Sequence, residues 1–382
     1  MTTETTRKIF TRDFILGFSA QFTFIAVYHI LIPTLPIYLS KSGSTESEIG
    51  ILIGVFFVSS LVLRPFVGKA LLRIPEKSFM IVGALLFALS SFSYLLASPF
   101  WPFFTVRVFQ GIALAFFHTA SFTLIANISP RAHRGQSLGY FLLASNFSLA
   151  LSPPIGMFII NHFSFTLLFL VCSGASLCCL CITSQLRRTQ IAPSEDSPGR
   201  KEFLLSSKAL PASIISFFNM IVWGALTAFF PLYAVNQGVA DPGLFFTAIA
   251  AMLFVARAFG GRILDLYSKE RVIPVLITTY VISMTLLAFS KNLPMFIFVA
   301  LIFGIGNAFL SPIVMAYALD RAGSSPGPVV GTYTALSDLG LGLGPVIMGF
   351  IVRFSSYPVM FLCLAFTAVI NLIYFYFFVR KK

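Results

Sequence analysis

The sequence predicts an all-α membrane protein in which twelve transmembrane helices form two pseudo-symmetric six-helix bundles. Of its 382 residues, 57% are hydrophobic and only 10% are charged, whereas soluble domains carry about 25% charged residues. The apolar residues form runs of about 20 or more without polar alternation, which indicates membrane-spanning helices rather than barrel strands. Segments of the first half also recur in the second half, which indicates a duplicated unit.

Turn and charge signals divide the chain into spans and one polar linker. The twelve predicted spans are 13–40, 48–72, 77–97, 100–128, 135–160, 163–186, 209–236, 242–266, 271–290, 293–319, 327–353 and 356–379. The segment 187–208 carries charges of both signs and two helix-breaking residues, Pro193 and Pro198. We therefore expect a linker there, between an N-terminal bundle at 1–186 and a C-terminal bundle at 209–382.

The repeat is visible in short matching segments. Residues 36–43, 64–73 and 139–153 recur as 231–238, 257–266 and 331–345, at offsets of 195, 193 and 192 residues. Since each copy has an even number of spans, the two copies are expected to run parallel in the membrane. This is the arrangement of two halves that move around a site near the bilayer midplane.

Basic residues predict the orientation. Of 26 Lys and Arg residues, 20 fall in loops on the side of both termini, and the opposite side has only Lys41, Lys291 and Arg353. This places both termini and the linker in the cytoplasm. The net charge of +13 therefore reports topology, and no nucleic-acid partner is expected. Residues 1–12 are polar and basic and precede a full-length span, so no cleavable signal peptide is expected.

No motif for catalysis, metal or a cofactor emerges. Cys178 and Cys181 form a C-x-x-C, but it lies in an apolar helix without His or acidic neighbours, so packing is the simpler interpretation. The chain has no phosphate-binding loop of the Walker type, so it is not expected to hydrolyse ATP or to act as an enzyme. The loop carboxylates Glu46, Glu48 and Glu76 are expected to be solvated.

A few polar residues lie inside the predicted spans, where a charge costs about 2.5–3.5 kcal/mol. Asp338 lies near the predicted midplane, and its repeat partner at offset 192 is Asn146. Asp338 could carry protons or contact substrate; alternatively it anchors a backbone group or an arginine. Arg107, with Gln110 one turn on, could bind an anion or lower the pKa of a carboxylate; alternatively it pairs with a helix-end carbonyl.

Histidines and aromatic residues provide further candidates. His29 and His118 could handle protons or substrate, or be hydrogen-bonded core residues. Tyr28, Asn219 and Trp223 lie in corresponding regions of the first and seventh spans; they could line a cavity or face lipid.

In the loop after the second predicted span, Gly68 and Arg73 match the pattern G-x-x-x-D-R-x-G-R-[RK], although Leu72 replaces the acidic residue. By this pattern and the repeats above, the chain resembles the major facilitator superfamily over essentially its whole length. The second copy keeps Gly261 and Asp265. In the family this loop is a cytoplasmic latch between the halves, so the resemblance implies that role for these four residues.

Two further motifs resemble those of proton-coupled exporters of this family. RVFQGIALA at 107–115 is similar to R-x-x-Q-G-x-[GA]-x-A, and the fifth and eleventh spans are similar to G-x8-G-x3-G-P-x2-G-G. The matching small residues and prolines are Gly139, Ser148, Ser152, Pro153 and Gly156, then Gly331, Gly340, Gly344, Pro345 and Gly349. Of these, Pro153, Gly156, Gly340, Gly344 and Pro345 are expected to serve helix packing or a hinge.

The resemblance implies a monomeric secondary transporter of a bacterial inner membrane that works by alternating access. We expect proton-coupled efflux of a small amphiphilic or anionic molecule, with proton coupling through Asp338, Arg107 and His29. The expected substrate contacts are Tyr28, Arg107, Gln110, His118, Asn146, Asn219, Trp223 and Asp338. The alternatives are import of a sugar, carboxylate or siderophore-like metabolite, movement of lipid or lysolipid, and a receptor or scaffold that does not transport.

Overall fold

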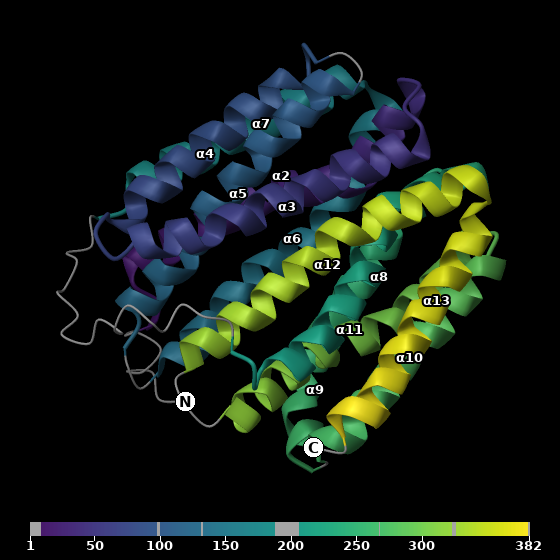
Figure 1. The fold of residues 1–382 in the computed structure, drawn as a ribbon. Helices are drawn as coiled ribbons and strands as arrows, with labels where there is room; N and C mark the ends of the chain where they lie inside the picture. The colour runs from purple at the N-terminus through teal and green to yellow at the C-terminus, as the bar shows by residue number, and fades with distance from the viewer. Residues whose placement is uncertain are drawn as a thin grey trace. The chain divides into compact units, whose positions relative to one another are not determined.

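The computed structural model describes residues 9–97, 100–130, 133–187, 206–266, 268–322 and 326–380. These residues form twelve long α-helices and one short π-helical turn (Figure 1). The helices are α2 Arg12–Lys41, α3 Glu46–Ala70, α4 Glu76–Ser93, α5 Trp101–Ile128, α6 Arg134–His162, α7 Phe165–Ser184, α8 Leu210–Asn236, α9 Gly243–Leu266, α10 Lys269–Phe289, α11 Leu293–Ala322, α12 Pro326–Phe354, α13 Tyr357–Tyr374 and the π turn η2 Phe375–Val379. Each predicted span falls on one helix, so the prediction of an all-helical fold with twelve long helices is confirmed.

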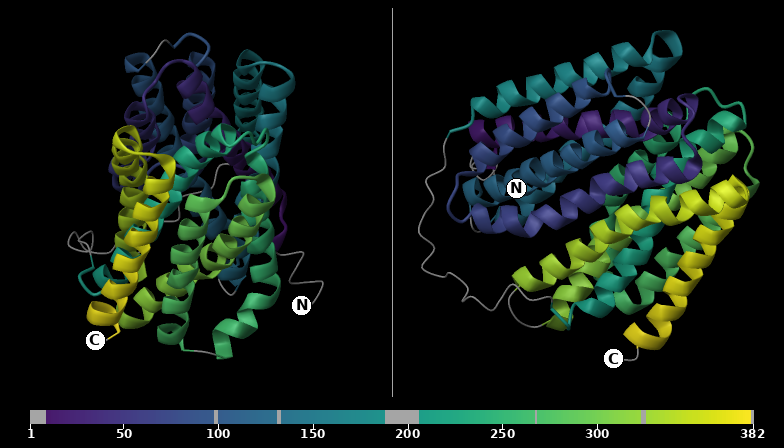
Figure 2. Two further views of the ribbon diagram at one scale, coloured as in Figure 1. Left: turned by 90° about the vertical axis from the view of Figure 1, so that its right-hand side faces the viewer. Right: turned by 45° about the horizontal axis from the view of Figure 1, so that its top comes forward.

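The surface of the helices suits a hydrocarbon solvent. Among the described residues, eleven helices are long and apolar enough to cross a membrane, and Gly243–Ala256 of α9 forms a shorter apolar stretch. Large apolar side chains are exposed along them, for example Phe66 at 67% and Phe366 at 65%. Such exposure is costly in water and neutral in lipid. Figure 2 shows the same long helices in two further orientations.

The sequence repeat is reproduced in helix boundaries. Helices α5, α6 and α7 begin at 101, 134 and 165, and α11, α12 and α13 begin 192 residues later in each case. Helices α6 and α12 both have 29 residues. The caps are repeated as well, because Ser164 accepts a bond from the Leu167 N–H and Ser356 accepts one from the Val359 N–H.

The turn after the first helix of each copy is also shared between the copies. Gly43 and Gly238 both have positive φ angles, of 88° and 79°, which only glycine adopts without strain. Before them, Tyr38 contacts the rings of Phe165 and Phe169. Its repeat partner Tyr233 contacts the rings of Tyr357 and Phe361 in the same way.

By contacts the chain divides into two compact units. The first comprises Met1–Tyr38 and Val58–Pro193, and the second comprises Leu39–Phe57 and Ser194–Lys382. In the first unit α4 packs against α5 and α7; in the second, α12 lies along α8 and α13 lies along α10 (Figure 1). The segment Leu39–Phe57, which the sequence assigned to the N-terminal bundle, thus groups with the second unit.

Glycines explain why the first half of α3 belongs to the second unit. A Cβ atom on Gly50 would lie 2.3 Å from the Pro345 carbonyl oxygen, and one on Gly54 would lie 2.4 Å from that of Gly342. These distances leave no room for a side chain, so the two backbones touch. Arg353 also donates a hydrogen bond to the Ser47 hydroxyl at 3.0 Å.

Candidate functional site

Arg107 lies in a buried polar cluster of the first unit. Its Nη1 donates to Gln110 Oε1 at 2.7 Å, and the Tyr94 hydroxyl donates to the same oxygen at 2.6 Å. Arg107 and Gln110 are one helical turn apart on α5, so a single face presents both. Arg107 is only 3% exposed and Gln110 is fully buried. The cluster therefore holds a permanent positive charge where water has little access, which favours an anionic ligand group.

Tyr94 was not identified from the sequence. It is a lone tyrosine at the C-terminal cap of α4, and no spacing rule connects it to α5. Tyr28, which was identified, is half-buried, and the Arg107 charge acts on the hydroxyls of both tyrosines. The structure thus brings Tyr28, Arg107 and Gln110 into one electrostatic neighbourhood.

His29 belongs to a second polar cluster in the first unit. Its Nδ1 lies 2.7 Å from the Ser148 hydroxyl, and that hydroxyl lies 3.3 Å from the one of Ser152. The serines are four residues apart on α6 and face α2. Both serines stand where the exporter motif has glycine, so the departure from the motif supplies a hydrogen-bonding partner for a buried imidazole.

Asn146 and Asp338 occupy equivalent places in the two units. Each is the thirteenth residue of a 29-residue helix, in α6 and α12 respectively. Both are buried, with 9% and 7% exposure. Among the described residues, the Asn146 Nδ2 has no hydrogen-bond partner. A buried amide and a buried carboxyl group therefore lie close to the middle of equivalent helices.

His118 lies on α5, half-buried, with its ring 4.7 Å from that of Phe122. The positive charge of Arg64 acts on this imidazole. On the same helix, Ser121 donates to Gln21 Oε1 of α2 at 3.0 Å. His118 is therefore placed near a fixed positive charge.

Asn219 and Trp223 serve contacts within the second unit. Asn371 of α13 donates to Asn219 Oδ1 at 3.0 Å and to the Ile215 carbonyl at 3.2 Å. Trp223 is half-buried and stacks on Phe303 of α11, with ring centroids 5.9 Å apart. Asn219 thus joins α8 to α13, an arrangement that the sequence could not indicate because it does not say which helix lies opposite.

The expected latch is described only in its first copy. Gly68 lies in the last turn of α3, where an added Cβ atom would meet nothing within 4 Å, and Arg73 is exposed in the turn that follows the helix. Gly261 and Asp265 lie in α9, but their side chains are outside the described residues. The structure therefore gives Arg73 an accessible position and leaves the latch role a prediction.

The expectation that Glu76 is solvated is wrong. Glu76 is 4% exposed, and its Oε1 accepts a hydrogen bond from Asn127 at 2.6 Å. The reason is packing, because Glu76 begins α4 where that helix lies against α5. The neighbouring Lys77 donates to the carbonyls of Ser184 and Leu186 at the end of α7, where a cation is favourable.

The other two loop carboxylates are only half-buried, and one has a structural task. The Thr45 N–H donates to Glu48 Oε2 at 2.7 Å, while the Glu48 N–H lies 3.4 Å from Thr45 Oγ1. This reciprocal pair is a capping box at the start of α3. Glu46 is half-buried next to it.

The small residues predicted to serve packing lie at close helix contacts. A Cβ atom on Gly340 or Gly344 would lie 2.4 Å from the carbonyl oxygen of Phe217 or Ile221 in α8. A Cβ atom on Gly156 would lie 2.9 Å from the Ile30 carbonyl in α2. Pro153 and Pro345 lie inside α6 and α12. Backbone contact of this kind is typical of helix packing in membranes.

Cysteines and acidic residues form no metal-binding group of three or more within the described part of the chain. Cys178 and Cys181 are exposed on α7, and Cys179 between them is buried. The Cys179 thiol donates to the Ala20 carbonyl at 3.3 Å, which is a packing contact.

The fold and these residues define a polytopic helical membrane protein made of two repeated halves with buried polar groups in each. The family model described as "Major Facilitator Superfamily" matches residues 17–256 and 212–382. The chain belongs to this superfamily of membrane transporters, which are not enzymes, as the motif resemblance indicated.

Relatives of known name are distant. The chain is 24% identical over 353 residues to the staphylopine export protein of Staphylococcus aureus, covering 85% of this chain and 86% of that protein. It is 24% identical over 346 residues to the quinolone resistance protein NorA of the same species, covering 88% of each.

Solved structures show the same fold. The nucleoside transporter NupG superposes with a TM-score of 0.79 at 12% identity, covering 97% of this chain and all of that one. The human organic anion transporter MFSD10 superposes with a TM-score of 0.69 at 15% identity, covering 98% of this chain and all of that one.

Proposed function

We propose that this secondary transporter exports a small amphiphilic or anionic molecule and couples export to inward proton movement. The observation that carries the proposal is Asp338, a carboxyl group 7% exposed near the middle of α12. A carboxyl group at this depth can bind and release a proton. A carboxylate that stayed ionised at all times would be costly inside the membrane. The two relatives named as an export protein and a resistance protein support the direction.

Arg107 supports the chemistry of the substrate. An arginine cannot release its proton at physiological pH. Its role is therefore to attract an anionic group of the substrate or to lower the pKa of a carboxylate. Gln110 and Tyr94 hold the guanidinium in place through a shared oxygen. The aromatic side chain of Tyr28, on which the Arg107 charge acts, would accept an apolar or aromatic part of the same molecule.

Alternating access supplies the mechanism. Proton and substrate must favour different states of the transporter, because a ligand shifts only equilibria between states that it binds unequally. We propose that both termini are cytoplasmic, on the distribution of the basic residues. By its resemblance to the superfamily, we propose a monomer in a bacterial inner membrane.

The test uses purified protein and two probes chosen from the names of the relatives, a quinolone and staphylopine. Affinity is measured between pH 5.5 and 8 for wild type, Asp338→Asn and the control Asp320→Asn. Asp320 is an exposed acid paired with Lys269. If one proton is released per substrate bound, affinity changes about tenfold per pH unit. We expect this dependence in wild type and Asp320→Asn and its loss in Asp338→Asn.

Persistence of the pH dependence in Asp338→Asn would make that carboxyl group structural and refute the coupling mechanism. Direction is tested separately in acid-loaded inverted vesicles. Addition of a transported probe should make the vesicle interior more alkaline if the protein is a proton antiporter. Flux without a pH change would favour a facilitator, and the absence of flux for all probes would favour the receptor or scaffold alternative.

One structural feature favours the importer alternative. Ser148 and Ser152 replace two glycines of the exporter motif; Ser148 forms a hydrogen bond with His29, and Ser152 forms one with Ser148. Uptake of the probes into right-side-out vesicles, driven by an inward proton gradient, would establish import and refute export.

A further inference from the structure

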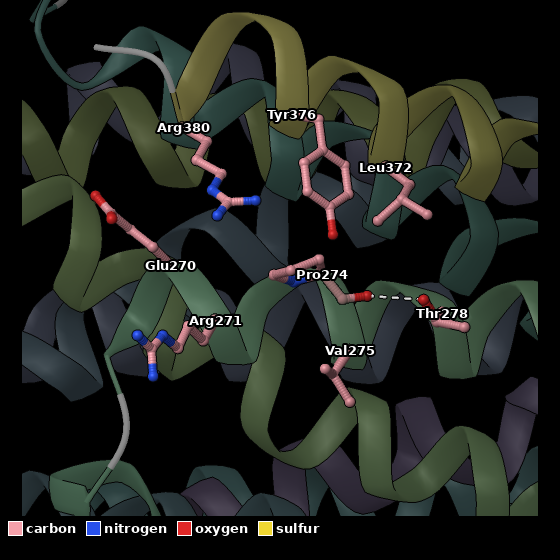
Figure 3. A pocket seen from close by; sticks show the side chains of 8 residues that line it. All are labelled: Glu270, Arg271, Pro274, Val275, Thr278, Leu372, Tyr376 and Arg380. Atoms are coloured by element: carbon pink, nitrogen blue, oxygen red, sulfur yellow. Dashed lines mark hydrogen bonds between the residues drawn. The ribbon is translucent and has the colours of Figure 1, made fainter.

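A groove opens between α10 and α13 at the end of the second unit where α10 begins and the chain approaches its C-terminus. Its volume is about 270 Å³. Figure 3 shows its lining as two parallel rows, one on each helix. The row from α13 and η2 consists of Leu372, Tyr376 and Arg380, and the row from α10 includes Arg271, Val275 and Thr278. Residues three or four apart share a helix face, so each row is a continuous stripe.

The character of the lining changes along the groove. Arg271 and Arg380 lie at one end, Tyr376, Pro274 and Val275 lie about one turn further along, and Leu372 and Thr278 lie beyond them (Figure 3). The Thr278 hydroxyl donates to the Pro274 carbonyl, so charged groups are followed by a hydroxyl-bearing ring and then by a mainly apolar lining over about two helical turns. A glycerophospholipid has the same order from its phosphate through its ester region to its acyl chains.

The side chains of the groove face outward from the unit. Val275 is 64% exposed and Tyr376 is 40% exposed, and both arginines are exposed. Phe377 and Phe378 beside them are 61% and 60% exposed. In a chain of this family such apolar exposure lies against lipid, and tyrosine and arginine at helix ends lie at the interface.

The π-helical turn η2 shapes the cationic end of the groove. The Arg380 N–H donates to the Phe375 carbonyl, five residues earlier, at 2.9 Å. This wider turn places the Arg380 guanidinium 5.5 Å from the centre of the Tyr376 ring, a cation–π contact. Since π turns are rare and are frequent at functional sites, the turn is consistent with a specific task for Arg380.

The charge of the groove selects the headgroup. Two arginines and one acid, Glu270, are among the lining residues, so the lining has a net positive charge. Guanidinium groups bind phosphate with two parallel hydrogen bonds. Basic pockets between transmembrane helices are known to bind anionic lipid headgroups.

We propose that the groove between α10 and α13 binds one anionic glycerophospholipid, whose phosphate contacts Arg271 and Arg380 and whose acyl chain lies against Leu372 and Val275. This lipid is a structural ligand on the outside of the second unit. It is distinct from the transported substrate, and the proposal depends on membership of the superfamily but not on the direction or coupling of transport.

The test measures lipid binding to the full-length protein by native mass spectrometry and by thermal shift. The probes are phosphatidylglycerol, phosphatidylcholine and inorganic phosphate. The variants are Arg271→Gln with Arg380→Gln, Val275→Trp, and the control Arg134→Gln. Arg134 is an exposed arginine at the start of α6 in the first unit.

We expect wild type and the control to bind phosphatidylglycerol and to be stabilised by it, with weaker effects of phosphatidylcholine. Loss of two arginines near the surface should weaken phosphatidylglycerol binding about 30-fold. Val275→Trp keeps both charges but fills the apolar part of the groove, so it should weaken both lipids. Inorganic phosphate should not displace the lipid, because it lacks the acyl chain.

Equal binding of phosphatidylglycerol by wild type and the double arginine variant would overturn the proposal. Equal affinity for phosphatidylcholine would show that charge does not select the lipid, and full displacement by inorganic phosphate would reduce the groove to an anion site; either result also refutes it. Since all substituted residues are exposed, folding of the variants is expected and is checked by their melting temperature in the absence of lipid.

Discussion

The two units use equivalent helix pairs differently, and the pair α2 and α6 is best compared with the pair α8 and α12. In the second unit, Gly340 and Gly344 bring the α12 backbone against α8, where a Cβ atom on Gly224 would lie 2.6 Å from the Leu341 carbonyl oxygen. In the first unit, the corresponding helices carry Ser148, Ser152 and His29, which form hydrogen bonds. Both pairs also share features: a Cβ atom on Gly156 of α6 would lie 2.9 Å from the Ile30 carbonyl oxygen of α2, and the Ser216 and Ser337 hydroxyls lie 2.7 Å apart between α8 and α12. The pairs differ at one repeat position, where the first unit has the buried imidazole of His29 and the second has Gly224 at a backbone contact.

Helix lengths, turns and some aromatic contacts are the same in both copies of the repeat. Helices α6 and α12 have equal length, Gly43 and Gly238 share a positive φ, and Tyr38 and Tyr233 contact corresponding rings. Features present twice are those that a six-helix bundle needs in order to fold. Features present once, such as Arg107 and the His29 cluster, are therefore the better candidates for function.

The largest effect is expected at Arg107, which has no basic counterpart in α11, where Val299 and Ala300 are apolar and buried. In Arg107→Gln the buried charge is lost, and binding of an anionic probe should weaken by about 2–3 kcal/mol, or about 30- to 150-fold. Arg107→Lys keeps the charge and should lose less. Titration of the quinolone and staphylopine measures both, and unchanged affinity in Arg107→Gln would assign the arginine a structural role.

The next effect tests the close contact in the second unit. Gly344→Ala places a methyl group 2.4 Å from the Ile221 carbonyl oxygen, so the helices must separate at a cost of about 1–3 kcal/mol. The control is Gly331→Ala on the same helix, where the added carbon meets nothing within 4 Å. Unfolding in denaturing detergent compares the two; equal stability would contradict backbone contact between α8 and α12.

A double-mutant cycle tests the corresponding contact of the first unit. His29→Ala, Ser148→Ala and the double variant should show a coupling of about 0.5–1.5 kcal/mol in unfolding free energy. Ser148→Gly restores the motif residue and should lose the same coupling. If the two single effects simply add, the hydrogen bond between α2 and α6 contributes nothing to stability.

The smallest effect concerns the turn before α9, outside the membrane spans. Burial raises the pKa of Asp241 above its ordinary value, partly offset by hydrogen bonds from the N–H groups of Gly243 and Leu244. The folded state therefore disfavours the ionised form, and stability should decrease as pH rises through this pKa. Asp241 is only half-buried, so solvent screening keeps the effect below about 1 kcal/mol.

Asp241→Asn keeps an oxygen that can accept the Gly243 N–H and removes the titration. Its stability should match that of wild type near pH 3 and be equal or higher at pH 7, measured as melting temperature across that range. At the same turn of the first copy the cap is the Thr45 and Glu48 pair. A decrease in stability of Asp241→Asn at pH 7 would show that the ionised carboxylate is the favoured cap.

Hydrophobic length and the spacing of turns were enough to predict the number of helices, their boundaries within a few residues, the repeat and the polar residues inside the spans. These two signals are sufficient because each helix forms its backbone hydrogen bonds within its own segment. A span can therefore be recognised without knowledge of its neighbours. The partners of the polar groups emerged only from the folded chain: Tyr94 for Gln110, Asn371 for Asn219, Ser148 for His29 and Asn127 for the buried Glu76. Helical periodicity gives the face of a residue, but the helix opposite that face depends on rotation and packing, which side chains distant in the sequence determine.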